Sequence, residues 1–203
     1  VTVPETIDGM AVTVIGESAF AEHTDVTRVA MPDNVTEVRS NAFANCTALN
    51  KINLPSGLTY LGHSAFWSCT SLTEIEIPAS LEKTADEYDY TGPFAKSGLK
   101  EVKFEEGTTQ IAERLFKDCA ALEDVIIPDS VTEIETEAFY KCTDLKSVEF
   151  GKNVEVIWNG AFRECTELTQ VELPDTVTRI EQDAFAGDTA LNKINLPSGL
   201  TYL

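Results

Sequence analysis

The chain is built from a repeated unit of 23 residues, and this repeat limits what it can fold into more than any other feature. The unit is clearest in residues 122–144, which read LEDVIIPDSVTEIETEAFYKCTD. The next 23 residues, 145–167, read LKSVEFGKNVEVIWNGAFRECTE and place the same residue types at the same offsets. Self-similarity at a period of about 20–29 residues, rich in Leu, Ile and Val, is typical of a solenoid whose units stack into one continuous core.

An Ala-Phe pair followed three residues later by Cys is the most reliable marker of the unit. The marker phenylalanines are separated by 23, 23, 28, 22, 23, 23 and 23 residues, and they are Phe20, Phe43, Phe66, Phe94, Phe116, Phe139, Phe162 and Phe185. Two units break this rhythm. The first carries five extra residues around ETIDGMA (5–11), and the irregular unit at 78–99 carries its extra residues within ADEYDYTG (85–92). Such insertions become surface loops, often on the binding face, although a neutral insertion is an open alternative.

Each unit predicts two short extended segments and a turn. The first segment follows the Cys position, and its inward residues are Leu49, Ile52 and Leu54 in one copy. A proline such as Pro55 usually closes it, because proline fixes φ and lacks the N–H that a strand needs. A second extended piece follows, for example residues 131–134, and we expect a single helical or 3₁₀ turn to carry the Ala-Phe pair. The sequence therefore predicts an α/β repeat solenoid, a right-handed, strand-rich coil of about eight 23-residue units.

Stacking places equivalent positions of successive units about 4.8 Å apart, so residues of similar shape must fill each column. The marker phenylalanines form the thickest column, and burying each ring contributes about 2–3 kcal/mol. Five cysteines share another position: Cys46, Cys69, Cys119, Cys142 and Cys165. Neighbouring sulfurs on parallel coils would lie about 5 Å apart, which fits disulfide geometry poorly, and the number of cysteines is odd. We expect buried, reduced thiols that act as small hydrophobic groups.

The chain is strongly acidic, with 34 acidic and 15 basic residues and a formal net charge of −19. An acidic surface repels the phosphates of nucleic acids and of anionic membranes, so neither is an expected partner. No segment approaches 18 consecutive apolar residues, and no direct membrane insertion is expected. Cationic proteins or neutral ligands such as glycans are easier to accommodate, although solubility alone is a sufficient reason for the charge.

The sequence contains no recognised catalytic or metal-binding motif. There is no G-x-S-x-G, H-E-x-x-H, P-loop or EF-hand spacing, and no C-x-x-C or His pair gives the ligand spacing of a zinc site. His23 stands at the Cys position of the first unit, one unit away from Cys46, and a solvent-facing end of the column is a sufficient reason for a polar residue there. We therefore expect no enzyme activity, no metal and no cofactor.

The pattern L-x-x-I-x-L-P-x-x-V-x-x-I-x-x-x-A-F-x-x-C-T, repeated eight times in register, resembles the BspA-type leucine-rich repeat family over essentially the whole chain. The opening, VTVPETIDGMAVTVIGESAF, resembles the typical first unit of that family. The resemblance implies a secreted or surface-attached bacterial protein that acts as an adhesin toward host proteins or other microbes. The ligand does not follow from it, because leucine-rich repeats bind through variable surface positions.

The candidate binding residues are aromatic and lie beside the irregular unit. Tyr60 and Tyr88 stand six residues before their marker phenylalanines, Tyr90 stands four before one, and Trp67 directly follows another. His63 belongs to the same stretch. Exposed aromatic side chains with a polar group are typical recognition anchors, so we predict stacking on sugars or peptides. The alternative is that these rings only cover the insertion.

We expect one leucine-rich-repeat domain over residues 1–203, with a first unit at 1–25, an irregular unit at 78–99 and a last repeat cut part-way, as in a piece of a longer protein. The predicted function is a non-enzymatic interaction module of an extracellular or cell-surface bacterial protein, whose signal and anchor lie outside this segment. Its partner would be a host or microbial surface protein or a glycan. A structural spacer and a substrate-recognition module of a larger secreted enzyme are the alternatives. Residues 47–61 (TALNKINLPSGLTYL) recur letter for letter at 189–203, which fits a scaffold better than an enzyme.

Overall fold

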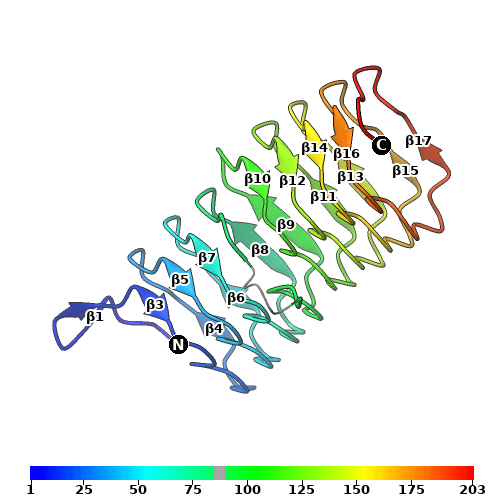
Figure 1. Ribbon diagram of the computed structural model, residues 1–203. Helices are drawn as coiled ribbons and strands as arrows, with labels where there is room; N and C mark the ends of the chain where they lie inside the picture. The colour runs from blue at the N-terminus through cyan, green and yellow to red at the C-terminus, as the bar shows by residue number, and fades with distance from the viewer. Residues whose placement is uncertain (85–89) are drawn as a thin grey trace.

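The computed structural model describes residues 1–84 and 90–203, which form a solenoid of stacked coils with a β-hairpin at its N-terminal end (Figure 1). We number the coils by their marker phenylalanine, from coil 1 at Phe20 to coil 8 at Phe185. Most coils contribute one short strand to each of two strand columns, A and B, that run along the solenoid. The predicted repeat solenoid of about eight 23-residue units is thereby confirmed.

Column A is formed by the extended piece that precedes each Ala-Phe pair. Its strands are parallel and one unit apart in register, so that Glu133 lies opposite Val156, which in turn lies opposite Arg179. In each two-residue strand the second side chain is buried and the first faces outward. The strands are β3 (Val14–Ile15), β5 (Glu37–Val38), β7 (Tyr60–Leu61), β10 (Gln110–Ile111), β12 (Glu133–Ile134), β14 (Val156–Ile157) and β16 (Arg179–Ile180).

Column B is formed by the extended segment that follows the Cys position. Its strands also pair in parallel, two by two along the solenoid. The predicted inward residues Leu49, Ile52 and Leu54 are buried. The strands are β4 (Arg28–Val29), β6 (Lys51–Ile52), β8 (Glu74–Ile77), β9 (Glu101–Phe104), β11 (Asp124–Ile126), β13 (Ser147–Glu149), β15 (Gln170–Val171) and β17 (Lys193–Ile194).

The extra residues of the first unit form the β-hairpin, which is antiparallel, unlike the coils. It pairs β1 (Thr6–Ile7) with β2 (Met10–Ala11) through a turn at Asp8 and Gly9. Both turn residues have positive φ, 51° and 79°, as the two-residue turns that match the twist of paired strands require. The extra residues of the irregular unit lie partly at 85–89, outside the described residues.

A single stack of phenylalanine rings forms the middle of the core. Neighbouring marker rings have centroids 5.1–6.0 Å apart and planes within 17° of parallel, from Phe20 to Phe185. The widest spacing, 6.0 Å, separates Phe94 from Phe116, next to the irregular unit. The six inner rings are fully buried, so each stabilises the stack by both area removed from water and ring contact on two faces.

The predicted helical or 3₁₀ turn at the Ala-Phe pair is wrong, because the described residues contain no helix. In coil 2 the backbone visits the left-handed region at Asn41 and Asn45, with φ of 57° and 60°. The N–H groups of Asn41, Phe43 and Asn45 then point along the solenoid and donate to carbonyl groups of coil 3 at 2.8–3.1 Å. In a helical turn these N–H groups would instead donate to carbonyl groups of the same coil. Here they form a third set of hydrogen bonds between coils, beside those of columns A and B. The fold of the described residues is therefore all-β rather than α/β.

The five cysteines lie in one buried column beside the phenylalanine stack, and all are free thiols. Each Sγ contacts the carbonyl oxygen of the marker phenylalanine in the preceding coil at 3.0–3.3 Å, so the thiols act as donors along the column. Burial raises the pKa of all five thiols, to about 12 for Cys69. They therefore stay protonated at neutral pH and are poor nucleophiles.

Coil 8 places Asp188 at the Cys position. Its side chain is buried, and Oδ1 accepts a hydrogen bond from the backbone N–H of Cys165 at 2.8 Å. The second oxygen, Oδ2, is buried without a hydrogen-bond partner. Burial raises the pKa of the Asp188 carboxyl to about 7, and the bond from Cys165 opposes this shift only in part. A carboxyl group thus stands where the other coils carry a neutral donor.

Candidate binding surface: an aromatic and cationic ridge

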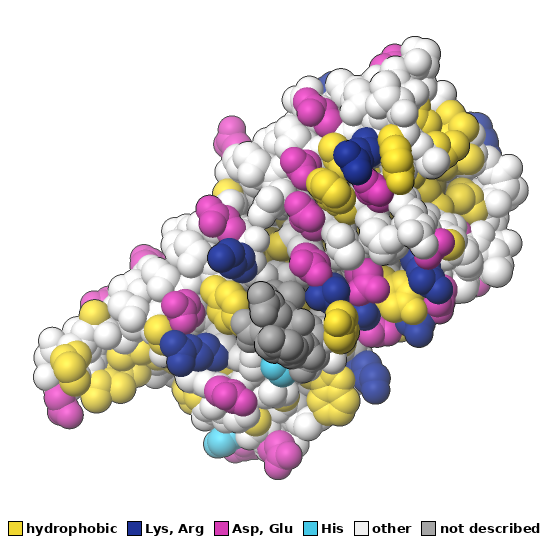
Figure 2. All heavy atoms as spheres, viewed as in Figure 1, with side chains coloured by type: hydrophobic (Ala, Val, Ile, Leu, Met, Phe, Trp, Pro, Cys, Tyr) yellow, Lys and Arg dark blue, Asp and Glu magenta, His cyan; other side chains and the backbone are white. Residues whose placement is uncertain are grey.

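A ridge of aromatic and basic side chains runs along coils 3 to 7, beside the marker phenylalanines. The Ala-Phe pair points into the core, and the ridge is made by residues two before and one or two after the phenylalanine, which range from buried to exposed. In the middle of the solenoid these positions carry the side chains that define the ridge: Trp67, Lys96, Arg114, Lys117, Glu137, Tyr140, Lys141, Arg163 and Glu164, joined by Tyr90. Figure 2 shows basic and hydrophobic side chains in the middle of the molecule, with acidic side chains among them.

The first two contacts of the ridge are cation–π pairs that involve residues chosen from the sequence. The Nζ atom of Lys96 lies 5.3 Å from the ring centroid of Trp67, in the neighbouring coil. The Cζ atom of Arg114 lies 4.8 Å from the ring centroid of Tyr90, whose side chain is 64% exposed. Each pair joins two coils, so the ridge exists only because the coils are stacked in register.

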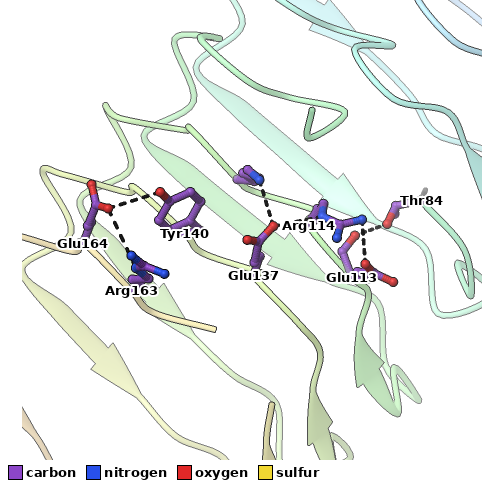
Figure 3. A network of polar contacts seen from close by, with 8 residues as sticks. Thr84, Glu113, Arg114, Glu137, Tyr140, Arg163 and Glu164 are labelled. Atoms are coloured by element: carbon purple, nitrogen blue, oxygen red, sulfur yellow. Dashed lines mark hydrogen bonds and ion pairs between the residues drawn. The ribbon is translucent and has the colours of Figure 1, made fainter. Parts of the chain in front are cut away.

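Tyr140 is the centre of the ridge. Three cations surround its ring, with Lys117, Lys141 and Arg163 at 4.9, 5.1 and 5.8 Å from the centroid. The tyrosine hydroxyl donates to Glu164 Oε1 at 3.1 Å, which fixes the ring (Figure 3). The ring of Tyr140 is thus in cation–π contact with basic side chains from three successive coils.

Ion pairs hold the basic side chains of the ridge in place. Glu137 Oε2 accepts from Arg114 Nε at 2.9 Å and from Lys117 Nζ at 2.8 Å (Figure 3). The side chains of Arg114 and Lys117 are only 13% and 10% exposed, so these pairs are screened less than surface pairs. Burial alone would raise the pKa of the Glu137 carboxyl, but the hydrogen bonds and charges of Lys117 and Arg114 outweigh it and leave the pKa lowered.

The ridge differs in charge from the rest of the protein. It holds five of the 15 basic residues of a chain whose net charge is −19: Lys96, Arg114, Lys117, Lys141 and Arg163. Tryptophan, tyrosine and arginine are also the residues most enriched among binding hot spots, since each presents a large contact area with a polar end. The ridge therefore has the composition of a protein-binding surface, and it is richer in basic residues than the rest of this acidic chain.

The five residues proposed from the sequence do not form one patch. Trp67 and Tyr90 belong to the ridge, whereas Tyr60 lies in β7 of column A. There it lines a groove of about 530 Å³ together with Glu37, Arg39 and Lys83 among others.

His63 and Tyr88, the two remaining candidates, are not part of the ridge as the structure describes it. His63 is half-buried, with its Nδ1 atom inside the fold, and Tyr88 lies outside the described residues. The binding role of the four described candidates stays a prediction.

Sequence reasoning missed Tyr140 and its three cations. The signal was present, because Tyr140 directly follows its marker phenylalanine as Trp67 does. The pairing with basic residues 20–24 positions away becomes visible only when the repeat is written as stacked columns. Within residues 1–84 and 90–203 no group of three His, Cys, Asp or Glu side chains could hold a metal ion.

The family follows from the repeat itself. The chain matches the BspA type leucine-rich repeat region, in six copies, over residues 5–119 and 90–203. The chain belongs to this family. Leucine-rich repeat proteins are in general protein-interaction modules, and this BspA-type chain has their architecture. In its described part there is no helix that is long and apolar enough to cross a membrane.

Solved bacterial structures share the fold of this BspA-type chain. A leucine-rich repeat protein of T. pallidum is 29% identical, with a TM-score of 0.61, over 95% of this chain and 77% of that one. One from Eubacterium ventriosum is 25% identical, with a TM-score of 0.74, over 93% of this chain and 49% of that one. A leucine rich cell surface protein of Faecalibacterium prausnitzii is 23% identical, with a TM-score of 0.50, over 98% and 82%. No protein of curated function matches the chain.

Proposed function

We propose that this BspA-type chain is a non-enzymatic interaction module of a secreted or cell-surface bacterial protein, and that it binds a protein partner through the ridge. The observation that carries the proposal is the set of five basic side chains around Trp67, Tyr90 and Tyr140 on successive coils of an otherwise acidic chain. Proteins of this family are typically bacterial surface or secreted proteins, which supports the location and the adhesive role.

The chemistry of the ridge favours recognition over reaction. Four of its five cations are held by Glu137 and Glu164, so they are positioned before a partner arrives and little side-chain entropy is lost on binding. The aromatic rings supply contact area, and the basic groups supply hydrogen bonds to backbone carbonyl or carboxylate groups of the partner. The five thiols of the chain are protonated and buried in the core, outside the ridge, so they do not serve as nucleophiles.

A binding screen tests this proposal. The chain would be screened against host extracellular-matrix proteins, bacterial surface proteins and a glycan array, beside the variant Trp67→Ala/Tyr90→Ala/Tyr140→Ala. We expect a protein partner whose affinity falls by about tenfold or more in the variant, as hot-spot truncations do. Ile126→Ala removes an exposed apolar side chain from column B and serves as the matched control, which should leave affinity unchanged.

Circular dichroism would establish that all variants are folded. A partner bound equally well by the triple variant would contradict the ridge as the binding surface. Binding to no member of any class would instead favour the structural spacer, and binding only to the substrate of an attached enzyme would favour the recognition module of a hydrolase.

A further inference from the structure

A second aromatic surface lies on column A near the C-terminal end of the solenoid. We call it the platform, and its residues are Glu133, Glu135, Trp158, Arg179, Glu181 and Tyr202. The strands beneath it are β12, β14 and β16, which are paired in one sheet, and Tyr202 is joined to Arg179 by a further β-bridge. Figure 2 shows hydrophobic, basic and acidic side chains side by side at this end of the molecule.

Arg179 is the centre of the platform. Its guanidinium carbon lies 5.5 Å from the ring centroid of Trp158 and 5.0 Å from that of Tyr202. Trp158 Nε1 donates to Glu133 Oε2 at 2.8 Å, and Arg179 forms an ion pair with Glu181. Trp158 is therefore held by the neighbouring coil and Arg179 by its own, as a pre-organised contact surface requires.

The platform is accessible as well as ordered. Tyr202 is 51% exposed and the Arg179 side chain 47% exposed, while Trp158 is half-buried. A Trp and a Tyr that each contact one partly exposed Arg have the composition of an interface centre.

The rim of the platform is acidic, unlike the ridge. Glu135 and Glu181 flank Trp158 at the equivalent position of the two neighbouring coils, and Glu133 lies beside it. Arg179 pairs with Glu181 and Trp158 donates to Glu133, whereas in the described part of the chain Glu135 has no ion pair. Burial raises the pKa of the Glu135 carboxyl, and the nearby charges of Glu133 and Glu113 raise it further. Among the described residues the Glu135 carboxylate therefore has no cation paired with it, and the rim keeps this negative charge.

We propose that the platform is a second docking surface, which takes a basic segment of a protein partner. Lysine or arginine side chains of that segment would lie against the accessible parts of the Trp158 and Tyr202 rings and pair with Glu135. A cation near an aromatic face and a carboxylate gains from both, and the acidic field of the chain attracts a basic segment from a distance. This surface is separate from the ridge and has a partner of opposite charge preference.

The two tryptophans of the chain allow the two surfaces to be observed separately. Trp67→Phe leaves Trp158 of the platform as the only tryptophan, and Trp158→Phe leaves Trp67 of the ridge. Each variant would be titrated with an alternating Lys-Gly hexapeptide, an Asp-Gly hexapeptide of equal length and a neutral hexasaccharide, with tryptophan emission as the signal. We expect a saturable change at Trp158 with the lysine peptide only, and no change at Trp67.

A charge variant distinguishes the platform from general attraction to an acidic protein. Glu135→Gln should weaken binding of the lysine peptide to the Trp67→Phe chain by about tenfold, because it removes the unpaired carboxylate beside Trp158. Glu101→Gln makes the same charge change on an exposed residue of column B and should alter affinity by less than about twofold, as expected for a screened, distant charge.

Three results would overturn the proposal. Equal responses at Trp67 and Trp158, or equal losses from Glu135→Gln and Glu101→Gln, would mean that only net charge attracts the peptide. A response at Trp158 to the hexasaccharide but not to the lysine peptide would make the platform a glycan site. A partner for the ridge could still be found in any of these cases, so failure here is distinct from failure of the proposed function.

Discussion

The same 15 residues occur twice in this chain, and the two copies differ in burial. In residues 47–61, Ile52 and Leu54 are 9% and 8% exposed. Their counterparts in residues 189–203, Ile194 and Leu196, are 38% and 54% exposed. The first copy has a described coil stacked on both sides, whereas the second has one on a single side. Because the two amino-acid sequences are identical, the difference shows that burial of these side chains depends on the coils stacked against a unit rather than on the unit itself.

Other features are the same in both copies. The side chains of Asn53 and Asn195 each bridge backwards to the backbone of the preceding coil, with Asn53 joining the N–H and C=O of Met31 at 3.1 and 3.0 Å. Asn195 makes the same pair of bonds to Leu173 at 2.6 and 2.9 Å. Contacts with the preceding coil thus survive at both places, and it is the contacts with the following coil that differ.

The largest expected difference concerns the buried leucine of each copy. Leu54→Ala should lower the free energy of unfolding by about 2–5 kcal/mol, since it removes a buried side chain and leaves a cavity. Leu196→Ala should lower it by less than about 0.5 kcal/mol, because that side chain is already exposed. Urea unfolding of both variants measures the two values. Equal losses would mean that the two copies have equivalent surroundings in solution.

The next largest effect concerns the residue that precedes each copy, Cys46 in one case and Asp188 in the other. The pKa of the Asp188 carboxyl is about 7 in the folded chain, against about 3.9 when unfolded. The folded form thus binds a proton more tightly, and the free energy of unfolding should fall as pH rises from about 4 to about 7. Asp188→Asn should remove this dependence and stabilise the chain at pH 8 by about 1–3 kcal/mol, the cost of an unsatisfied buried polar group.

Unfolding curves at pH 4.5 and pH 8 measure this effect for the parent chain and for Asp188→Asn. The variant Asp188→Cys introduces the residue found in five other coils and serves as a second control. A parent chain whose stability does not change relative to Asp188→Asn between these pH values would show that the carboxyl is hydrated rather than buried.

A smaller and equal effect is expected at the two bridging asparagines. Asn53→Ala and Asn195→Ala each remove two hydrogen bonds to the preceding coil, and each should destabilise by about 1–2 kcal/mol. The comparison between them is the informative quantity, and it is best measured by hydrogen exchange of the N–H groups of Met31 and Leu173. Loss of protection at one site and not at the other would show that the copies differ on this side too.

The smallest effect concerns the left-handed residue before each copy, which is Asn45 in one and Gly187 in the other, with φ of 60° and 83°. Ser68 occupies the same position in coil 3 with φ of 59°. Ser68→Gly should raise the free energy of unfolding by up to about 1 kcal/mol, because glycine adopts positive φ without steric cost. Asn45→Gly should change it by only a few tenths, since asparagine tolerates this region. A clear loss of stability in Ser68→Gly would contradict the strain assigned to the position.

The period of the repeat, the phenylalanine stack and the inward residues of the strands could all be predicted from the sequence. Each depends on the spacing of residues within one unit, which a linear sequence displays directly. The turn at the Ala-Phe pair could not be predicted in this way. Asn41 and Asn45 tolerate positive φ, but Glu137 and Lys141 at the same positions of coil 6 do not favour it. Glu137 and Lys141 adopt positive φ because the hydrogen bonds to the next coil offset the strain.

The surfaces were harder to predict for a related reason. Trp67 was found because it is a large ring beside an insertion, but its partner Lys96 belongs to the next coil. Tyr140 and Trp158 were missed, because the cations that contact these rings, such as Arg163 and Arg179, belong to the next coil. A register between coils, not a motif within one, creates both the ridge and the platform.

The central claim is that the ridge is where this interaction module meets its protein partner. Hydroxyl-radical footprinting of the chain, alone and with a partner recovered from the screen, tests it most directly, because tryptophan and tyrosine side chains are labelled in proportion to their exposure. The account predicts that labelling of Trp67, Tyr90 and Tyr140 falls in the complex. Unchanged labelling of all three, with protection confined to column B residues such as Ile126, would contradict it.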